Sequence, residues 1–268
     1  MPELPEVESY RYLAEGALGR VVTNVVAPDP WYLKEGLTAS RLVAAVEGRS
    51  FTAARRVGKL LLLDTAGDSG DGAGRAPTVG LRFGMSGRLL VDGVAGVGRL
   101  VGSGGREEGA WDRVSFGFAD GGGLVVRDPR RLGGVILDPD ESRLGTDALA
   151  VTPAGLRRAL EGSTAPLKVR LLDQSRLAGV GNLVADEVLY RAGLDPARPA
   201  GSLTPAEMRR LHRHLGAALA DLMARGGSHT GDLHPARILG GRCPRDGTPL
   251  QRRTVGGRST WSCPRHQR

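Results

Sequence analysis

The sequence predicts an α+β protein that begins with a leading helix and an amino-terminal β-sandwich, continues with helices and ends in a small basic β-hairpin. Three observations support this fold class. Short β-type runs separated by turn residues fill the segment 21–137, a pattern typical of sandwiches and barrels. After Asp138 the pattern changes to helices with capping residues at their starts. From Gly226 onward glycine and arginine are abundant. We therefore expect three domains, at residues 1–138, 139–225 and 226–268.

The amino-terminal domain is predicted to open with a helix over residues 5–18, where Val7, Tyr10 and Leu18 recur on one face. A second helix and a series of strands follow it. The second helix is predicted at Leu37–Val46, and the strands at Val21–Val26, Phe51–Val57, Leu60–Asp64, Val79–Phe83, Arg88–Val91, Arg113–Phe118, Leu124–Arg127 and Val135–Leu137. Gly67–Gly74 and Asp92–Gly109 contain too few apolar residues for strands and are predicted to be surface loops.

The middle of the chain shows helix-start signals. Thr152 precedes Pro153, which is typical of an N-cap followed by the first helical residue. Thr204 and Glu207 fit a capping box. Helices are predicted from Thr152 and over Pro166–Asp173, Asn182–Ala192 and Thr204–Arg225, and a hairpin is predicted around Gln251–Thr260.

The charge of the chain is concentrated at its carboxyl end. The net charge is +8 over 268 residues, and residues 226–268 hold eight arginines against two aspartates. A basic end on a near-neutral body indicates a polyanionic partner, of which nucleic acid is the commonest. The alternative is a tail that only improves solubility.

Membrane and secreted classes are disfavoured. No apolar run approaches the roughly 18 residues of a membrane span, and the first residues lack the basic-then-apolar pattern of a signal peptide. We expect a cytoplasmic protein without a membrane partner. In a reducing compartment the two cysteines suit metal ligands or bystanders better than a disulfide.

The first residues carry candidate chemistry. Methionine before a small residue such as Pro2 is normally removed, which would leave a secondary amine at the terminus. An α-amino group titrates close to neutral pH, so part of it is uncharged. Such an amine attacks aldehyde-like carbons and forms an iminium ion, and the carboxyl of Glu3 follows directly. The alternative is a plain helix start, with Pro5 in the first turn and acids near the helix dipole.

Two further patterns suggest binding sites. Gly179 and Gly181 precede a predicted helix, where successive N–H groups form an anion-binding nest, and Asn182 is placed to cap that helix and donate to a phosphate. Ordinary packing between helices is the alternative. In the carboxyl-terminal segment, two pairs of candidate ligands are separated by sixteen residues, a spacing typical of zinc hairpins. The pairs are Cys243 with Asp246 and Cys263 with His266; His229 and His234 are reserve candidates, and a hairpin without metal is the alternative.

These stretches resemble motifs of the formamidopyrimidine-DNA glycosylase and endonuclease VIII family. The matching segments are Pro-Glu-Leu-Pro-Glu-Val-Glu at residues 2–8, Gly-Lys-Leu-Leu at 58–61, Ala-Gly-Val-Gly-Asn-Leu-Val-Ala-Asp-Glu at 178–187 and Gly-Gly-Arg-Ser-Thr at 256–260. The resemblance implies a helix–two-turns–helix domain at 139–225 and a zinc-finger-like β-hairpin at 226–268. It further implies a monomeric base-excision-repair enzyme that acts on damaged double-stranded DNA as both glycosylase and abasic-site lyase.

The resemblance also implies roles for single residues. Pro2 attacks C1′ of the deoxyribose, Glu3 protonates the sugar ring oxygen, and Lys59 assists the β-elimination that cuts the strand. Arg258 grips the phosphates beside the lesion and assists a second cut by δ-elimination. The DNA-contacting residues are Met85, Arg130 and Leu132, which fill the gap left by the extruded base, and Lys168, Gly181 and Asn182, which lie near phosphates.

The chain departs from the family pattern at three places. The usual four cysteines of the zinc site are replaced at Asp246 and His266, a Phe of the wedge is replaced by Leu132, and a family His is replaced by Trp111 or Arg113. The segment 226–243 is short, which favours oxidised pyrimidines or hydantoin-type lesions over oxidised purines. The alternative function is a non-catalytic or abasic-site-specific damaged-DNA-binding member of the same family.

Overall fold

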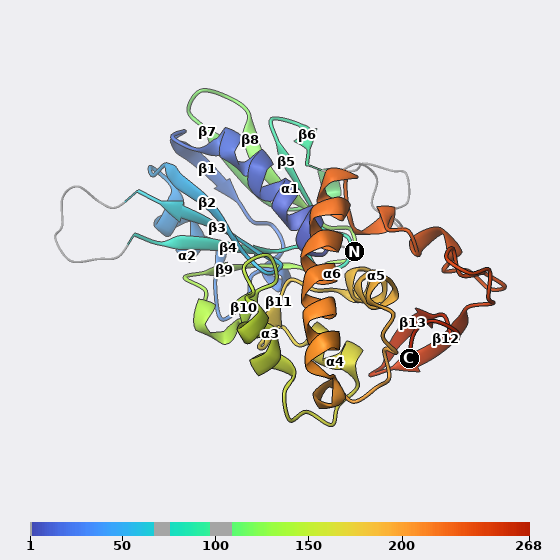
Figure 1. Cartoon of the computed structure of the whole chain (residues 1–268). Helices are drawn as coiled ribbons and strands as arrows, with labels where there is room; N and C mark the ends of the chain where they lie inside the picture. The colour runs from blue at the N-terminus through green and yellow to red at the C-terminus, as the bar shows by residue number, and fades with distance from the viewer. Residues whose placement is uncertain (1, 67–75, 97–108) are drawn as a thin grey trace. The chain divides into compact units, whose positions relative to one another are not determined.

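The computed structural model describes residues 2–66, 76–96 and 109–268 (Figure 1). The predicted loop 67–74 lies outside the described residues, as does 97–108 of the second predicted loop. The chain forms two compact units. The first contains Met1–Pro2 and Glu6–Glu141, and the second contains Glu3–Pro5 and Ser142–Arg268. This division does not test the predicted boundary between residues 225 and 226, which stays a prediction.

The first unit contains two antiparallel sheets, helix α2 (Ala39–Val46) and most of helix α1 (Leu4–Ala14). One sheet has the strand order β2-β3-β4-β9 and the other has the order β1-β7-β8-β5-β6. The strands are β1 (Val22–Val26), β2 (Phe51–Val57), β3 (Leu60–Thr65), β4 (Thr78–Arg82), β5 (Arg88–Val91), β6 (Val94–Ala95), β7 (Asp112–Phe118), β8 (Gly123–Arg127) and β9 (Gly134–Leu137). The predicted α+β class, with a leading helix and an amino-terminal β-sandwich, is confirmed.

The core of the first unit joins both sheets to α1. Along β7 buried and partly exposed residues alternate, as expected of a strand with one face toward a core. Phe51 of one sheet packs edge-on against Phe116 of the other, with ring centroids 5.5 Å apart. Tyr10 of α1 contacts Phe83, with centroids 4.5 Å apart. Leucine and valine supply most of the rest.

Two local predictions need correction. The helix predicted over 5–18 ends at Ala14 and continues as a 3-10 turn, because Gly16 and Gly19 interrupt it; Gly19 has a φ of 76°. The loop predicted over 92–109 begins with β6, which pairs with β5. Asp92 and Gly93 make the tight turn between them, with φ angles of 49° and 80°.

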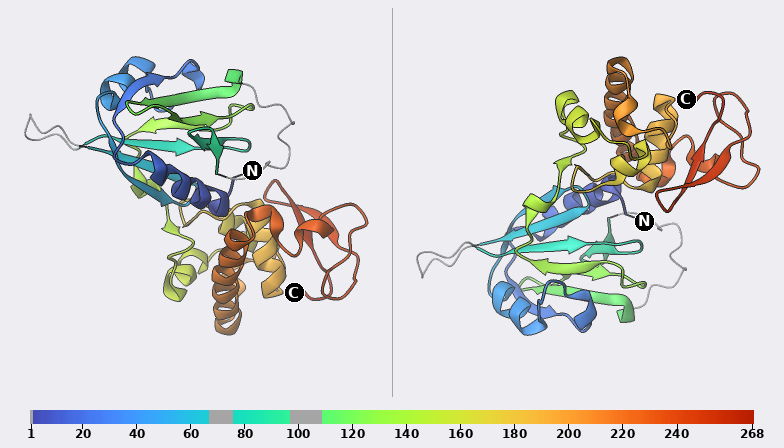
Figure 2. Two further views of the ribbon diagram at one scale, coloured as in Figure 1. Left: turned by 90° about the horizontal axis from the view of Figure 1, so that it is seen from above. Right: turned by 90° about the horizontal axis from the view of Figure 1, so that it is seen from below.

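The second unit is built from four helices, a short parallel bridge and a hairpin. The helices are α3 (Pro153–Leu160), α4 (Leu167–Leu172), α5 (Asn182–Ala192) and α6 (Pro205–Ala224), and the strands are β10 (Thr146–Asp147), β11 (Leu177–Ala178), β12 (Gln251–Val255) and β13 (Arg258–Ser262). Thr152 caps α3, and Thr204 and Glu207 form the predicted capping box of α6. Figure 2 shows the irregular segment that follows α6 and leads to the hairpin β12–β13, and β13 packs against α5.

Candidate functional site

Glu3 is seated at the start of a helix in the second unit. Its side chain is fully buried, and its two carboxylate oxygens accept hydrogen bonds from the N–H groups of Leu183, at 2.8 Å, and Val184, at 3.0 Å. Both donors belong to the first turn of α5, where the helix dipole stabilises negative charge. Leu4 N–H donates to the carbonyl of Gly179, which fixes the peptide that follows. Pro2, the preceding residue, is also buried.

Two glycines make room for this peptide. A Cβ at Gly181 would lie 2.2–2.5 Å from side-chain atoms of Glu3, and one at Gly179 would lie 2.4 Å from Leu4 Cδ1. Gly179 has a φ of 111°, as predicted for a residue in a conformation that favours glycine, whereas Gly181 is extended with a φ of −116°. Gly181 is therefore needed for space. The helix start holds the carboxylate of Glu3 through the N–H groups of Leu183 and Val184, whereas the Gly179 N–H donates to Gln174 Oε1 at 3.0 Å. An anion-binding nest at the glycines and a phosphate contact by Gly181 stay predictions.

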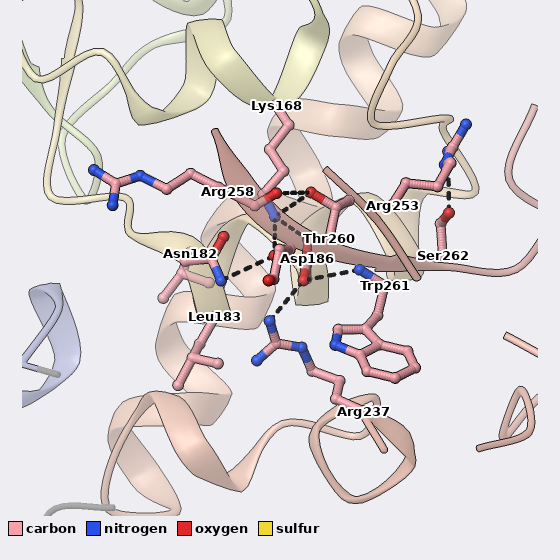
Figure 3. A network of polar contacts seen from close by, with 12 residues as sticks. Lys168, Asn182, Leu183, Asp186, Arg237, Arg253, Arg258, Thr260, Trp261 and Ser262 are labelled. Atoms are coloured by element: carbon pink, nitrogen blue, oxygen red, sulfur yellow. Dashed lines mark hydrogen bonds and ion pairs between the residues drawn. The ribbon is translucent and has the colours of Figure 1, made fainter. Parts of the chain in front are cut away.

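Asn182 and the hairpin residue Arg258 belong to one local arrangement. Asn182 is the first residue of α5 and does not cap it with its side chain, which corrects the predicted capping role. Its Nδ2 instead donates to the carbonyl of Ser259, at 3.2 Å. Arg258 follows the turn Gly256–Gly257 and is exposed. Figure 3 shows its guanidinium extended away from the polar contacts around it.

A buried ion cluster lies beneath this hairpin (Figure 3). Lys168 and Asp186 are both fully buried, with Lys168 Nζ 2.6 Å from Asp186 Oδ1. Asp186 Oδ2 accepts from Arg237 at 2.9 Å and from Trp261 N–H at 3.3 Å. Burial lowers the pKa of Lys168 and raises that of Asp186, and the attraction between the two charges opposes both shifts. Sequence reasoning missed Asp186, Arg237 and their pairing, because no local spacing signals contacts between residues so far apart.

In the first unit Lys59 lies in the turn between β2 and β3 and is partly exposed. The turn is held to α1 by Arg56, whose Nε lies 2.7 Å from Glu8 Oε2 and whose Nη1 donates to the carbonyl of Gly58 at 2.9 Å. Gly58 has a φ of 60°, as a tight two-residue hairpin turn requires. Lys59 therefore lies in a turn that Arg56 ties to α1.

Two loops of the first unit meet at the buried carboxylate of Asp128. Its oxygens accept from the hydroxyl of Ser86, at 2.5 Å, and from the N–H groups of Arg130, at 3.1 Å, and Gly133, at 2.9 Å. Arg113 donates to the Asp128 carbonyl at 2.8 Å. This arrangement holds together the loops that carry the predicted wedge residues.

Both apolar wedge candidates are exposed on these loops. Met85 is 43% exposed and Leu132 is 50% exposed, although apolar side chains of this size are usually buried. A Cβ at Gly84 would lie 2.4 Å from the carbonyl carbon of Leu132, which shows how closely the loops pack. The loops that carry Met85 and Leu132 are therefore in contact next to these residues, and Arg130 lies on the same loop as Leu132.

We expect the Asp128→Ala substitution to destabilise the protein, because it leaves several buried donors without an acceptor. The free energy of unfolding should fall by about 1–3 kcal/mol. Urea unfolding would measure this. Asp120→Ala is the matched control, since Asp120 is an exposed aspartate in an ion pair with Arg20 and its loss should cost less than about 1 kcal/mol. An equal loss in the two variants would contradict the role given to Asp128.

The four predicted metal ligands form one cluster in the second unit. One ligand atom from each of Cys243, Asp246, Cys263 and His266 lies within 4.8 Å of all the others. Both cysteines are free thiols. In the described part of the chain, this cluster does not include the reserve candidates His229 and His234.

The donor set fits a metal ion. His266 Nε2 lies 3.2 Å from the carbonyl of Tyr190, a contact that orients the ring and turns Nδ1 toward the cluster, as at most histidine-metal sites. Asp246 Oδ1 accepts the N–H of Thr248 at 2.9 Å, and this hydrogen bond lowers the pKa of the carboxyl. The carboxylate is therefore held in the charged form that a cation requires.

Comparison with known proteins places these observations in a family. Residues 1–135 match the model of the formamidopyrimidine-DNA glycosylase N-terminal domain, and residues 144–233 match that of the formamidopyrimidine-DNA glycosylase H2TH domain. The formamidopyrimidine-DNA glycosylase of Azorhizobium caulinodans is 37% identical over 219 residues, which cover 76% of this chain and 70% of that protein.

Solved structures of the same family have a fold similar to that of this chain. The Lactococcus lactis Fpg in complex with DNA containing an abasic site has a TM-score of 0.81 and 25% identity, with 100% of both chains covered. The MutM (Fpg) protein of Thermus thermophilus has a TM-score of 0.78 and 33% identity, covering 99% of this chain and 98% of that one. Each helix in the described part of the chain is too short or too polar to span a lipid bilayer. The sequence relatives, the matched domains and the shared fold show that the chain belongs to the formamidopyrimidine-DNA glycosylase family of DNA glycosylases.

Proposed function

We propose that this protein removes oxidised bases from damaged double-stranded DNA and then cuts the strand at the abasic site. The proposal depends mainly on the carboxylate of Glu3. This residue directly follows Pro2 in the sequence, its side chain is buried, and two N–H groups of α5 hold its carboxylate. A carboxylate held at a helix start next to a potential terminal amine suits proton transfer during covalent catalysis. Relatives with this fold have been solved with DNA containing an abasic site.

The first steps need only these two residues. After removal of Met1, the Pro2 nitrogen attacks C1′, and the bond between C1′ and the base breaks with its electron pair leaving on the base. The proton that the tertiary ammonium then carries passes to Glu3. Glu3 delivers this proton to the ring oxygen O4′, the C1′–O4′ bond opens, and the nitrogen lone pair completes the C1′=N iminium. No external oxidant or reductant is required.

Strand cleavage follows from the iminium. It acidifies the C2′ protons, and loss of one of them expels the 3′ phosphate by β-elimination. Lys59 assists these proton transfers, since a lysine exchanges protons at accessible pH whereas an arginine stays charged. Arg258 holds the flanking phosphates through its planar fork and assists δ-elimination at the 5′ side.

The surface features of the first unit suit an extruded nucleotide. Flipping a base out of the duplex leaves an unstacked gap, which apolar side chains can fill. Met85 and Leu132 are the two exposed apolar residues for this role, with Arg130 against the orphaned partner base. The side chain of Leu132 is smaller than that of the Phe usual at this position in the family, so it would fill less of the gap.

A panel of duplexes, each with one lesion, tests the proposal. We expect excision and nicking of oxidised pyrimidine or hydantoin lesions to exceed those of 8-oxoguanine, because the segment 226–243 is short. Gel mobility of the products separates β- from δ-elimination. Tight binding to abasic DNA without any nick would instead favour the alternative of a non-catalytic damaged-DNA-binding protein.

The metal site completes the proposal. We propose that Cys243, Asp246, Cys263 and His266 hold Zn²⁺, an ion that accepts thiolate, imidazole and carboxylate ligands in tetrahedral sites. The four residues flank the hairpin β12–β13 on both sides in sequence, so a bound ion would tie its two ends together. The free energy of zinc binding would stabilise the folded form of the hairpin that carries Arg258.

Restoring a thiolate at position 246 is expected to tighten zinc binding. Asp246→Cys replaces a hard oxygen ligand by a softer sulfur, and we expect affinity to rise on the order of tenfold to a hundredfold. Competition with a chromophoric chelator measures this. Asp232→Cys, at an exposed position outside the cluster, controls for an added thiol. Equal zinc affinities of the two cysteine variants and the wild type would rule out Asp246 as a ligand.

A further inference from the structure

Lys168 is one of only three lysines among the 37 lysine and arginine residues of the chain. Its ammonium is fully buried, and the structure accounts for all three of its N–H donors. They go to Asp186 Oδ1 at 2.6 Å, Thr260 Oγ1 at 2.9 Å and the Ser259 carbonyl at 3.2 Å. No donor remains for a phosphate in this arrangement.

The contacts of Lys168 converge on Arg258 and Asn182, two of the residues expected to bind phosphate. Thr260 Oγ1, which accepts from Lys168, donates in turn to the carbonyl of Arg258 at 2.9 Å. The Ser259 carbonyl, which also accepts from Lys168, accepts from Asn182 Nδ2 at 3.2 Å. One buried ammonium is therefore linked through a single intermediate group to the backbone of Arg258 and to the side chain of Asn182 (Figure 3).

The same cluster anchors the hairpin to the helices of the second unit. Asp186 on α5 accepts the N–H of Trp261 in β13, and Arg237 makes a further ion pair with it. At the turn of the hairpin, a Cβ on Gly256 would lie 2.3 Å from Val169 of α4, which shows direct packing there. These contacts lie on the strand and turn of the hairpin, whereas the metal ligands flank it in sequence.

A lysine suits this position for a physical reason. The ammonium is a compact charge whose three donors radiate from one nitrogen, whereas guanidinium donors lie in one plane at fixed angles. A carboxylate, a hydroxyl and a carbonyl surround Lys168 Nζ, and a planar fork cannot reach all three from the same point. In a chain that otherwise uses arginine almost throughout, a lysine here is consistent with that requirement.

We propose that Lys168 is a positioning residue that orients Arg258 and Asn182 for phosphate, with Asp186 and Thr260 as its partners, and that it does not contact DNA itself. This differs from the direct phosphate contact implied by the family resemblance. The inference rests on the proposed function, namely on phosphate binding by Arg258, and on the phosphate contact expected of Asn182.

The first experiment measures binding to a duplex with a single tetrahydrofuran abasic analogue, which is not cleaved. Thr260→Val keeps the shape of the side chain and removes the hydroxyl between Lys168 and Arg258. We expect affinity to fall about fivefold to tenfold, and Thr260→Ser, which keeps the hydroxyl, to bind within about twofold of the wild type. Urea unfolding selects conditions under which each variant is folded.

A double-mutant cycle separates positioning from independent effects. In an Arg258→Ala background, Thr260→Val should cause no further loss, because the residue through which it acts is gone. Two results would overturn the proposal. One is that Thr260→Val alone binds the duplex as tightly as the wild type. The other is that Thr260→Val lowers the affinity by the same factor in the Arg258→Ala background as in the wild type. If Arg258→Ala alone binds as tightly as the wild type, the phosphate role of Arg258 in the proposed function fails, and the positioning proposal fails with it.

The second experiment uses the unmodified protein and needs no variant to fold. Lysine acetylation is followed by mass spectrometry with and without the tetrahydrofuran duplex. Lys168 should stay unreactive in both states, while Lys34, a partly exposed lysine, reacts in both. A Lys168 that reacts in free protein and is protected by DNA would be a direct phosphate ligand, and the proposal would be wrong whatever the outcome for Arg258.

Discussion

Borohydride trapping of the protein on abasic DNA is expected to vanish when Met1 is retained. An intervening methionine turns the Pro2 nitrogen into an amide, whose lone pair is delocalised and not nucleophilic. Loss of a covalent nucleophile costs on the order of 10³-fold or more, so lyase activity should fall to that extent. Protein made with methionine removal inhibited, and checked by mass spectrometry, provides the change without any substitution.

The processed Pro2→Gly variant is the matched comparison. It ends in a primary amine, which still forms a Schiff base, so it should retain trapping at a reduced rate. Both preparations should bind the tetrahydrofuran duplex, because binding does not need the amine. Trapping that persists at the wild-type rate in Met1-retaining protein would remove Pro2 from the mechanism and favour an internal lysine such as Lys59.

Base excision is expected to fall by about 10²–10⁴-fold in Glu3→Gln, the range for loss of a general acid–base group. The amide keeps the size of the side chain but cannot relay the proton from Pro2 to O4′. It also places an NH₂ group against N–H donors of Leu183 and Val184, so one of the two hydrogen bonds is lost. Single-turnover excision of an oxidised pyrimidine from a duplex would measure the effect.

Two controls define the role of Glu3. Glu6→Gln removes a second buried carboxylate, which lies in α1, and this variant should excise within about tenfold of the wild type because Glu6 has no role in the proposed chemistry. Glu3→Gln should still bind abasic DNA. Excision by Glu3→Gln at the level of Glu6→Gln would show that the carboxylate of Glu3 is only structural.

Local features of this chain could be predicted because they depend on neighbouring residues. The bounds of β2, β5 and α5 agree with the predicted ones, and the capping box of Thr204 and Glu207 is present. The four metal-ligand candidates also cluster as their spacing predicts. In each case, residues a few positions apart, or two ends of one hairpin, determine the geometry.

Features that depend on tertiary contacts could not be predicted in this way. The requirement for Gly181 comes from the side chain of Glu3, which is far away in sequence. The buried carboxylates of Asp128 and Asp186 look like ordinary surface residues in the sequence, yet each organises a set of functional candidates. Two-residue strands such as β6 carry too little periodicity to be recognised.

The membership of Leu4 in the core of the second unit has a consequence for biosynthesis. The other buried members of that core lie between Ala148 and Leu222, so the leading peptide has no place to dock until the ribosome has made most of the chain. Through that interval an aminopeptidase has access to the nascent end. Trimming would therefore precede docking, so removal of Met1 and folding of the second unit would follow in a fixed order during synthesis.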